Sequence, residues 1–252
     1  TFGIGRQQAS KDINNYLREV GIGNLEYDKY LKGYKPTGQF QPQVTQGLAD
    51  EYLHLMARNN ELMNVFESLA LNVSNAEVLS HPVRDVKPDV LRPIMQAARQ
   101  QKRLDCDYVS LNHPDREGRI IVPHTLVYTG LRWHVRAWCE KNQEYRDFVL
   151  SRFRDIPDIM DESEHGAADD TEYNTEVTIR ITPDPRLTPA QQEVIEIDYG
   201  MQGGALCITT RGKLVSYALK LLHVNPREQL ADPMAQQIIV ANRDELEPWL
   251  FG

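Results

Sequence analysis

The stretch that decides the fold is GRIIVPHTLVYTGLRWHVRAWCE, residues 118–140. It holds two runs rich in Val, Ile, Tyr and Trp, separated by a turn at Gly130, which is typical of a β-hairpin. DCDYVSLNHP precedes it and YRDFVLSRFRDI follows it, with further turns at Asp115, Gly118 and Asn142. The segment from 105 to 156 therefore predicts four short antiparallel strands that form a small, strongly bent sheet or barrel.

Polar side chains gather on one face of these predicted strands. Alternation along each strand gives three sets that share a face, and His124 follows a strand-breaking proline. The sets are Tyr108, Ser110 and Asn112; Arg132, His134 and Arg136; and Arg152 with Arg154. A bent sheet that brings these sets into one groove would bind an anion such as a phosphodiester or a nucleotide. The alternative is a polar, solvated sheet face, which is the usual result of alternation.

The first residues predict a helix that suits DNA recognition. Apolar residues from Ile4 to Leu17 mark one helix face, with Gly5 near the start and Gly21 expected as a left-handed cap. Arg and Gln contact base edges and Ser and Lys contact phosphates, mostly from the N-terminal part of a recognition helix. The outward face carries these types at Arg6, Gln7, Gln8, Ser10 and Lys11.

LEYDKYLKGYKPTGQFQP, residues 25–42, predicts a strand, a turn at Lys32-Gly33 and a return strand. A basic hairpin after a recognition helix is the order of a winged helix, and Lys29, Lys32 and Lys35 would lie beside phosphates. A helix this short needs packing partners, so we expect one or two helices upstream of this sequence. The alternative is a surface helix followed by a solvated hairpin.

Two more helices are predicted before the strands. Residues 48–71 carry two apolar stripes, which indicate a core or dimer seam, and a second helix opens at Pro88 and runs to about Gln101. After the strands, residues 157–174 read as an acidic linker. The last part predicts a compact α+β module with strands at 176–182, 205–211 and 236–242, helices at 188–198 and 213–223, and a glycine turn at 200–204.

Charge and composition limit the possible functions. The net charge is −8, yet residues 1–35 and 99–154 carry net charges of +2 and +4, whereas residues 155–252 carry −11. Two basic segments in an acidic chain suggest two anion sites, although charge fluctuates along any chain. The three cysteines form no CxxC pair, no apolar run reaches the ~20 residues of a membrane span, and no metal or catalytic motif occurs. These features favour a cytoplasmic protein without metal or cofactor that is not an enzyme.

The segments DYVSLNHP, PHTLVYTGLRWHVRAWCE and FVLSRFRDI resemble a WYL domain, with Trp133-His134-Val135 at the name-giving Trp-Tyr-Leu run. The opening FGIGRQQASKDINNYL is similar to the recognition helix of the BrxR/CapW group, WYL repressors found beside phage-defence operons of the BREX and CBASS types. The resemblance covers nearly the whole chain. It implies a ligand site formed by Tyr108, Ser110, His124, Arg132, Trp133, Arg136, Arg152 and Arg154.

The resemblance implies a multidomain α+β chain. Its parts would be a partial winged helix-turn-helix at 1–45, a helical linker at 46–103, an SH3/Sm-like WYL barrel at 104–160 and a C-terminal dimerisation module at 173–252. The expected function is that of a homodimeric repressor of a phage-defence operon, bound to an inverted-repeat operator and gated by a single-stranded nucleic acid or nucleotide. The alternatives are a nucleic-acid-processing enzyme that holds substrate on the basic sheet, and a structural adaptor.

Overall fold

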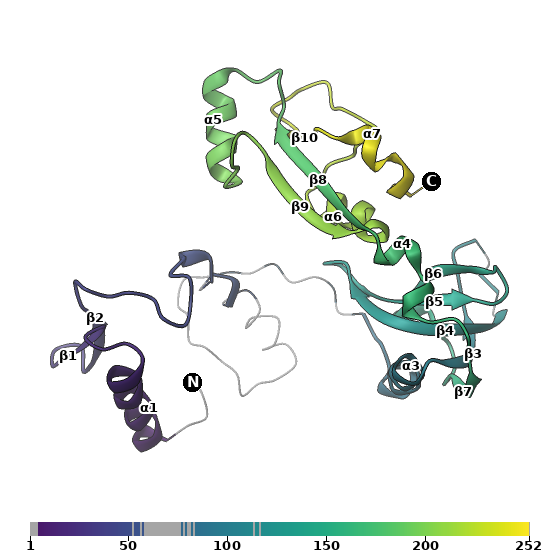
Figure 1. Cartoon of the computed structure of the whole chain (residues 1–252), viewed down its shortest axis with the longest axis horizontal. Helices are drawn as coiled ribbons and strands as arrows, with labels where there is room; N and C mark the ends of the chain where they lie inside the picture. The colour runs from purple at the N-terminus through teal and green to yellow at the C-terminus, as the bar shows by residue number, and fades with distance from the viewer. Residues whose placement is uncertain are drawn as a thin grey trace. The chain divides into compact units, whose positions relative to one another are not determined.

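The computed structural model describes residues 5–51, 53–55, 57, 77, 79, 82, 84–112, 114–115 and 117–251. The chain divides into two compact units, residues 1–82 and 83–252 (Figure 1). Within these described residues, no helix has the length and apolar character to cross a bilayer.

The N-terminal unit contains the predicted helix and hairpin. Helix α1 runs from Arg6 to Glu19, and strands β1 (Leu25–Asp28) and β2 (Gly33–Pro36) pair antiparallel. Lys32 adopts a left-handed φ of 50° in the turn between the strands. The prediction of a left-handed cap at Gly21 is wrong, because the positive φ belongs to Gly23. Gly21 is needed for a different reason: a Cβ there would overlap the ring of Tyr16.

A buried asparagine fixes the hairpin against the helix. Asn24 is 4% exposed, and its amide donates to Tyr16 Oη at 2.9 Å and to the carbonyl of Gln41 at 2.6 Å. Thr37 Oγ1 adds a hydrogen bond to the carbonyl of Gly23 at 2.7 Å. These bonds set the position of the hairpin relative to α1 within this unit. Of the predicted helix at 48–71, residues 49–51, 53–55 and 57 are helical, Leu48 precedes the helix, and the remainder lies outside the described residues.

The second unit begins with helix α3 and a five-stranded antiparallel sheet. Their bounds are α3 Pro88–Gln100, β3 Lys102–Tyr108, β4 Glu117–Tyr128, β5 Trp133–Cys139, β6 Glu144–Val149 and β7 Asp158–Glu162. The strand order is β6-β5-β4-β3-β7, so β6 and β7 are the two edges, and the sheet formed by the described strands is open. The helix from Pro88 and the four predicted strands are confirmed; β7 was not predicted.

Helix α3 packs on this sheet and closes its core (Figure 1). Its buried face consists of Val90, Ile94 and Ala97, spaced by four and three residues as a helix requires. These side chains join a cluster with Leu104 and Ile121 of the sheet. Pro88 occupies the first turn, where its missing N–H leaves no hydrogen bond unmade.

Three details of the predicted strands are wrong. Strand β3 ends at Tyr108, so Ser110 lies in a loop. Strand β6 ends at Val149 and continues as the 3₁₀ helix η2, Leu150–Arg152, so alternation does not apply to Arg152 and Arg154. Pro123 does not break its strand: β4 continues through it, and the register shifts at His124 as a bulge that accommodates the proline.

The prediction of an acidic linker at 157–174 is also wrong. Strand β7 pairs with β3, and the 3₁₀ helix η3 (Ala167–Asp169) and helix α4 (Thr171–Asn174) follow it. Asp170, between η3 and α4, is 1% exposed. The segment therefore packs on the sheet, and at least one of its acids has a structural partner.

The C-terminal part is a three-stranded sheet with order β10-β8-β9, covered by helices (Figure 1). The bounds are β8 Glu176–Pro183, α5 Pro189–Asp198, β9 Leu206–Arg211, η4 Gly212–Leu214, α6 Val215–Leu221, β10 Ile238–Val240, α7 Arg243–Leu246 and η5 Glu247–Trp249. The predicted strands and helices are confirmed. Thr188 and Gln191 form a capping box at the start of α5, as residues at the first turn of a helix commonly do.

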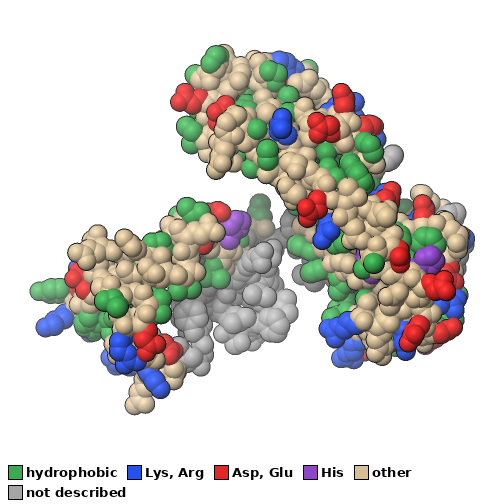
Figure 2. Space-filling view, in the orientation of Figure 1, with side chains coloured by type: hydrophobic (Ala, Val, Ile, Leu, Met, Phe, Trp, Pro, Cys, Tyr) green, Lys and Arg blue, Asp and Glu red, His purple; other side chains and the backbone are tan. Residues whose placement is uncertain are grey.

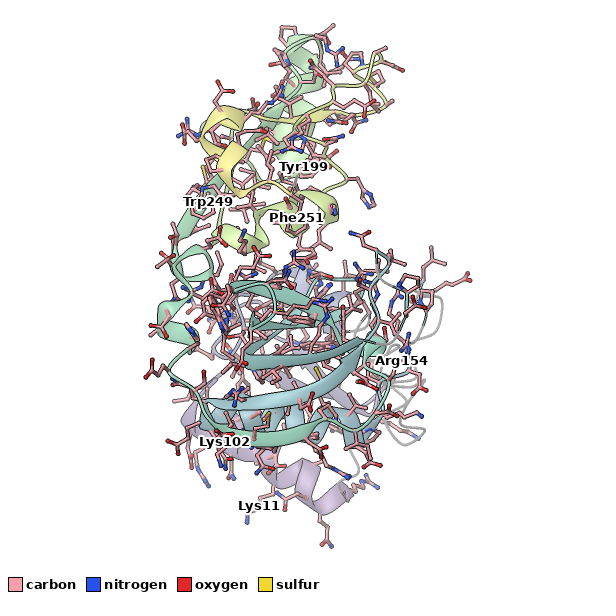
Figure 3. All side chains as sticks on the ribbon, turned by 90° about the vertical axis from the view of Figure 1, so that its right-hand side faces the viewer. Lys11, Lys102, Arg154, Tyr199, Trp249 and Phe251 are labelled. Carbon is pink, nitrogen blue, oxygen red and sulfur yellow. The ribbon has the colours of Figure 1, made fainter. Side chains whose placement is uncertain are left out.

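Gly212 provides a test of how tightly the C-terminal part meets α4. Its N–H donates to the carbonyl of Thr175 at 2.8 Å, and an added Cβ would overlap the Trp249 ring (labelled in Figure 3) and come within 2.8 Å of the Glu172 carbonyl. Gly212→Ala should lower the free energy of unfolding by about 1–3 kcal/mol, the usual range for overpacking. Urea unfolding followed by circular dichroism measures this change.

Gly118→Ala is the matched control, because the nearest heavy atom to a Cβ there is 4.0 Å away. We expect the control to change the unfolding free energy by less than about 0.5 kcal/mol. Equal effects of the two substitutions would contradict the packing described for Gly212.

Candidate nucleic-acid interface and anion site

The predicted DNA-contacting side chains of α1 share an exposed surface. They are Arg6, Gln7, Gln8, Ser10 and Lys11, all in the first two turns. The first turn contains no acidic residue, and Gln8 is held by a hydrogen bond to Asp12 Oδ1 at 2.6 Å. Figure 2 shows basic side chains around α1. A duplex that uses the Gln8 amide must therefore break its hydrogen bond to Asp12, whereas no acidic residue lies in the first turn beside Arg6.

The three predicted wing lysines are not equivalent. Lys29 and Lys32 are exposed in the β1–β2 turn. Lys35 lies on β2, with Nζ 3.3 Å from Glu26 and 3.2 Å from Asp28. The hydrogen bond to Asp28 raises the pKa of Lys35, and both acids offset its charge. Lys29 and Lys32 are therefore better placed than Lys35 to contact a phosphate.

Four of the predicted ligand residues do not join a common site. Tyr108 is a core residue whose hydroxyl accepts the N–H of Val149 at 3.0 Å. Ser110 is half-buried in a loop, and Trp133, 48% exposed, packs against Tyr128. Arg154 is exposed beside the sheet (Figure 3), where its guanidinium donates to backbone carbonyls of its own segment.

Arg136 is the centre of the polar cluster that does form. It lies on β5, is 3% exposed, and donates from Nε to Asp170 Oδ2 at 2.7 Å and from Nη2 to Oδ1 at 3.2 Å. Its Nη1 contacts Asp147 Oδ1 at 3.4 Å. Burial lowers the pKa of the Arg136 guanidinium, and the interactions with these carboxylates raise it by more. The pKa therefore lies above its usual value, and Arg136 remains charged. A buried cation requires such partners.

Asp170 has a second partner on the sheet. His124, in the β4 bulge, has Nε2 3.2 Å from Asp170 Oδ2, and its ring packs edge-on against Tyr145 and Tyr173. Burial raises the pKa of Asp170, but hydrogen bonds from His124, Arg136 and the Tyr173 N–H outweigh it and hold the pKa below its usual range. Asp170 is thus an ionised carboxylate held by two strands and by its own helix.

Asp147 connects Arg136 to the C-terminal part. It lies opposite Arg136 on β6, and its Oδ2 accepts the hydroxyl of Tyr217 on α6 at 3.1 Å. Burial raises the pKa of Asp147, whereas Arg136 and Tyr217 oppose that change. The hydrogen bond from Tyr217 therefore joins α6 to a carboxylate that is itself paired with Arg136 across β5 and β6.

His134 is a buried side chain without a polar partner. It lies two residues before Arg136 on β5, is 1% exposed, and packs its ring on Tyr217 with centroids 5.2 Å apart. Neither ring nitrogen has a hydrogen-bond partner among the described residues. Burial, with the nearby charges of Arg132 and Arg152, lowers the pKa of His134 to about 4. The ring is therefore neutral near pH 7, with one donor and one acceptor unused.

Arg132 and Arg152 have no carboxylate partner in the described part of the chain. Both are half-buried, and the charges of both act on His134. Together with the unused ring nitrogens of His134, they offer two cations and a hydrogen-bonding group to an anion. The chemistry matches a phosphate group better than an uncharged ligand. We call Arg132, His134, Arg152 and Tyr217 the anion cluster.

Of the predicted ligand residues, His124 and Arg136 therefore share Asp170, and the charges of Arg132 and Arg152 act on His134, whereas Tyr108, Ser110, Trp133 and Arg154 lie outside this cluster. Sequence reasoning placed His134 on the right face without assigning it a role, and it missed Asp147, Asp170 and Tyr217. No local signal marks Asp170 or Tyr217, because their partners lie 34 and 70 residues away in the chain. Among the described residues, no group of three or more His, Cys, Asp or Glu side chains could share a metal ion.

Three families of known domains match the chain in order. Residues 1–58 match the BrxR transcriptional regulator winged helix-turn-helix domain, residues 89–157 the WYL domain, and residues 176–246 the BrxR transcriptional regulator C-terminal dimerization domain. A solved structure of proteasome accessory factor B/C (PafBC) of Arthrobacter aurescens is similar with a TM-score of 0.34 and 13% identity, over 98% of this chain and 39% of that one.

Curated relatives match almost the whole chain. DNA-binding transcriptional repressors named CapW are 30% identical in Stenotrophomonas maltophilia, over 99% of this chain and 83% of the relative, and 32% identical in Pseudomonas aeruginosa, over 98% and 82%. CapW of Escherichia coli (strain KTE188) is 33% identical over 97% and 82%. The enzyme alternative is thereby set aside. The chain belongs to the BrxR/CapW family of DNA-binding transcriptional repressors, with a winged helix-turn-helix, a WYL domain and a C-terminal dimerization domain.

Proposed function

We propose that this protein is a homodimeric cytoplasmic repressor of a phage-defence operon, and that a nucleic-acid or nucleotide ligand bound at the WYL domain releases it from DNA. The observation that carries the ligand part is the anion cluster: within the described part of the chain, two arginines have no carboxylate partner, and their charges act on a buried histidine whose ring nitrogens make no hydrogen bond. The phage-defence setting rests on the resemblance to the BrxR/CapW group. The dimer rests on the C-terminal dimerization domain.

The DNA-binding surface we propose consists of the first two turns of α1 and the tip of the β1–β2 hairpin. Arg and Gln side chains can form bidentate hydrogen bonds with base edges, which suits Arg6, Gln7 and Gln8. Hydroxyl and ammonium groups bind phosphates, which suits Ser10, Lys11, Lys29 and Lys32. Lys35 contributes least, because Glu26 and Asp28 already offset its charge. Two such units in a dimer would contact half-sites about 34 Å apart on an inverted repeat.

We assign the WYL part an SH3/Sm-like topology. Its five strands follow the chain order β3 to β7, and β7 returns to pair with the first strand, β3, rather than with β6. The 3₁₀ helix η2 between β6 and β7 and the helix α3 before β3 fit the same scheme. Domain limits near 1–45, 104–160 and 173–252 are consistent with this assignment, with helical residues between the first two.

A ligand can release the operator only if it binds better to a form that does not bind DNA. In a dimer, a change in the separation of two DNA-binding units abolishes simultaneous contact with both half-sites, and most of the avidity is then lost. The anion cluster suits this role because Tyr217 belongs to the C-terminal part, whereas Arg132, His134 and Arg152 belong to the WYL part. A bound phosphate would therefore act on both parts at once.

Operator binding should depend on the start of α1. Arg6→Ala and Lys11→Ala should each weaken binding to a promoter fragment about tenfold and reduce its salt dependence, because each removes a cation that faces the duplex. Arg18→Ala is the control: Arg18 lies in the last turn of the same helix, paired with Glu19. Fluorescence anisotropy at several salt concentrations measures this, and equal losses for all three variants would contradict the proposed orientation.

Ligand response should depend on the anion cluster. Arg132→Ala and Arg152→Ala should leave operator affinity unchanged and reduce affinity for a single-stranded oligonucleotide at least tenfold, since each removes a cation that no carboxylate of the described residues neutralises. Arg146→Ala is the control, because Arg146 is exposed on β6 and paired with Glu144 at 2.6 Å. A normal response to oligonucleotide in both cluster variants would contradict the site.

We expect His134 to lower the free energy of unfolding and to contribute to ligand binding. His134→Phe should raise the free energy of unfolding at pH 7 by about 1–3 kcal/mol, because it removes two buried, unpaired nitrogens, and should abolish oligonucleotide binding. In the folded wild type, the pKa of His134 is about 4, below its ordinary value of 6.5. Between these two pH values, the unfolded chain therefore binds one proton more than the folded protein. Wild-type stability should therefore fall on the order of 3 kcal/mol more than that of the variant from pH 6.5 to 4. Parallel unfolding curves over this range would contradict the assignment.

A further inference from the structure

Arg136 holds the geometry of a phosphate site that is already filled by a carboxylate. The two hydrogen bonds from Nε and Nη2 to Asp170 use the guanidinium fork that equally fits two oxygens of a phosphate. Arg136 lies two residues from His134 on the same face of β5, so it borders the anion cluster. Asp170 covers the guanidinium of Arg136.

Asp170 belongs to the segment that leads into the C-terminal part. It accepts the N–H of Tyr173 at 3.0 Å and so caps α4, and β8 begins at Glu176. Its carboxylate also contacts Arg136 and His124, both on the sheet. The pair Arg136–Asp170 therefore clamps the start of the connecting segment 170–175 to the WYL sheet.

Two further contacts carry the position of Arg136 into the C-terminal part. Glu172, on α4, has Oε2 3.6 Å from Arg136 and 2.9 Å from Lys213 in η4. Asp147 bridges Arg136 and the hydroxyl of Tyr217. A change of partner at Arg136 is thus passed to η4 and α6 through side chains that already touch both parts.

Asp170 supplies the shortest carboxylate contact of Arg136. The guanidinium also faces the carboxylates of Asp147 and Glu172, and Glu172 is shared with Lys213. If Asp170 moved away, the site would lose one negative charge, which one phosphate group would replace. A phosphate and the Asp170 carboxylate cannot occupy the same fork of Arg136 together.

From these contacts we infer that Arg136 is a concealed phosphate-binding position, that Asp170 is a tethered anion which fills it in the ligand-free protein, and that a ligand phosphate displaces Asp170 and frees segment 170–175. This inference rests on the proposed function, because it requires a phosphate-bearing ligand at the WYL domain. It adds a second phosphate position beside Arg132 and Arg152, and it names the contact that ligand binding breaks. The ligand class is a strand with at least two neighbouring phosphates.

The test compares Asp170→Asn with the wild type. Asn is nearly the same size and still caps a helix, but it is neutral and competes weakly for Arg136. Asp170→Asn should bind a fluorescent single-stranded oligodeoxynucleotide of about 12 nucleotides about tenfold tighter, since a charge-assisted contact no longer has to be displaced. Asp169→Asn is the matched control. Asp169 is the exposed neighbour of Asp170, and its carboxylate accepts the Gly166 N–H. The affinity of Asp169→Asn for the oligonucleotide should equal that of the wild type.

A second measurement follows the segment itself. The Tyr173, Asn174 and Thr175 amides are hydrogen-bonded to residues 170 and 171. Their hydrogen exchange should accelerate when the oligonucleotide binds the wild type, and without ligand it should be faster in Asp170→Asn than in the wild type, because the segment is no longer clamped to Arg136. This readout on the wild type stands even if Asp170→Asn unfolds. Oligonucleotide binding that leaves these amides protected overturns the inference and leaves the proposed sensor intact.

If folded Asp170→Asn binds the oligonucleotide no more tightly than the wild type does, Arg136 is not a concealed phosphate-binding position, whereas the proposed sensor function stands. If neither the wild type nor Asp170→Asn binds the oligonucleotide, the proposed ligand and the concealed position both fall. Tighter binding by Asp170→Asn with unchanged affinity for Asp169→Asn supports both.

Discussion

The burial of one guanidinium determines how the second unit is assembled. A buried cation is stable only with carboxylate partners, because its hydration in water is worth several kcal/mol. Arg136 finds one partner on the neighbouring strand, Asp147, and another 34 residues later, Asp170. The second partner requires the chain after β7 to fold back over the sheet, and this places η3, α4 and the start of β8 where they are. The junction between the WYL part and the C-terminal part thus depends on an ion pair rather than on an apolar seam alone.

The same junction contains a group that stability alone does not explain. His134 is enclosed by the sheet and by Tyr217, and its ring nitrogens have no partner among the described residues. A leucine or phenylalanine there would avoid the desolvation penalty. The resemblance to the WYL domain sets Trp133-His134-Val135 at the Trp-Tyr-Leu run, with His134 at its middle position.

Local patterns in the sequence were enough to predict most elements. Alternation predicted β3 to β6, Pro88 predicted the start of α3, and the Thr188 cap predicted α5. The same patterns could not tell which face of β5 is solvated, because both faces are largely buried: Val135 and Ala137 on one, His134 and Arg136 on the other. Alternation along β3 likewise sets Tyr108 on the polar face with Ser110 and Asn112, yet its ring packs in the core. Composition failed at 157–174, since acidic residues usually mark solvated chain and the burial of Asp170 depends on a distant arginine.

Arg136 can pair either with the carboxylate of Asp170 or with a phosphate of the ligand. This competition would give the connecting segment two states without any large strain. The form with Asp170 bound fixes segment 170–175, and the form with phosphate bound does not, so the ligand has a different affinity for each arrangement of the C-terminal part. Such a difference is what any shift in population requires. Coupling of this kind is reciprocal, so operator DNA that favours the clamped form must weaken ligand binding by the same factor by which ligand weakens operator binding. The affinity of Asp170 for Arg136 then sets the ligand concentration at which repression ends, because a tighter clamp lowers the fraction of protein able to bind phosphate.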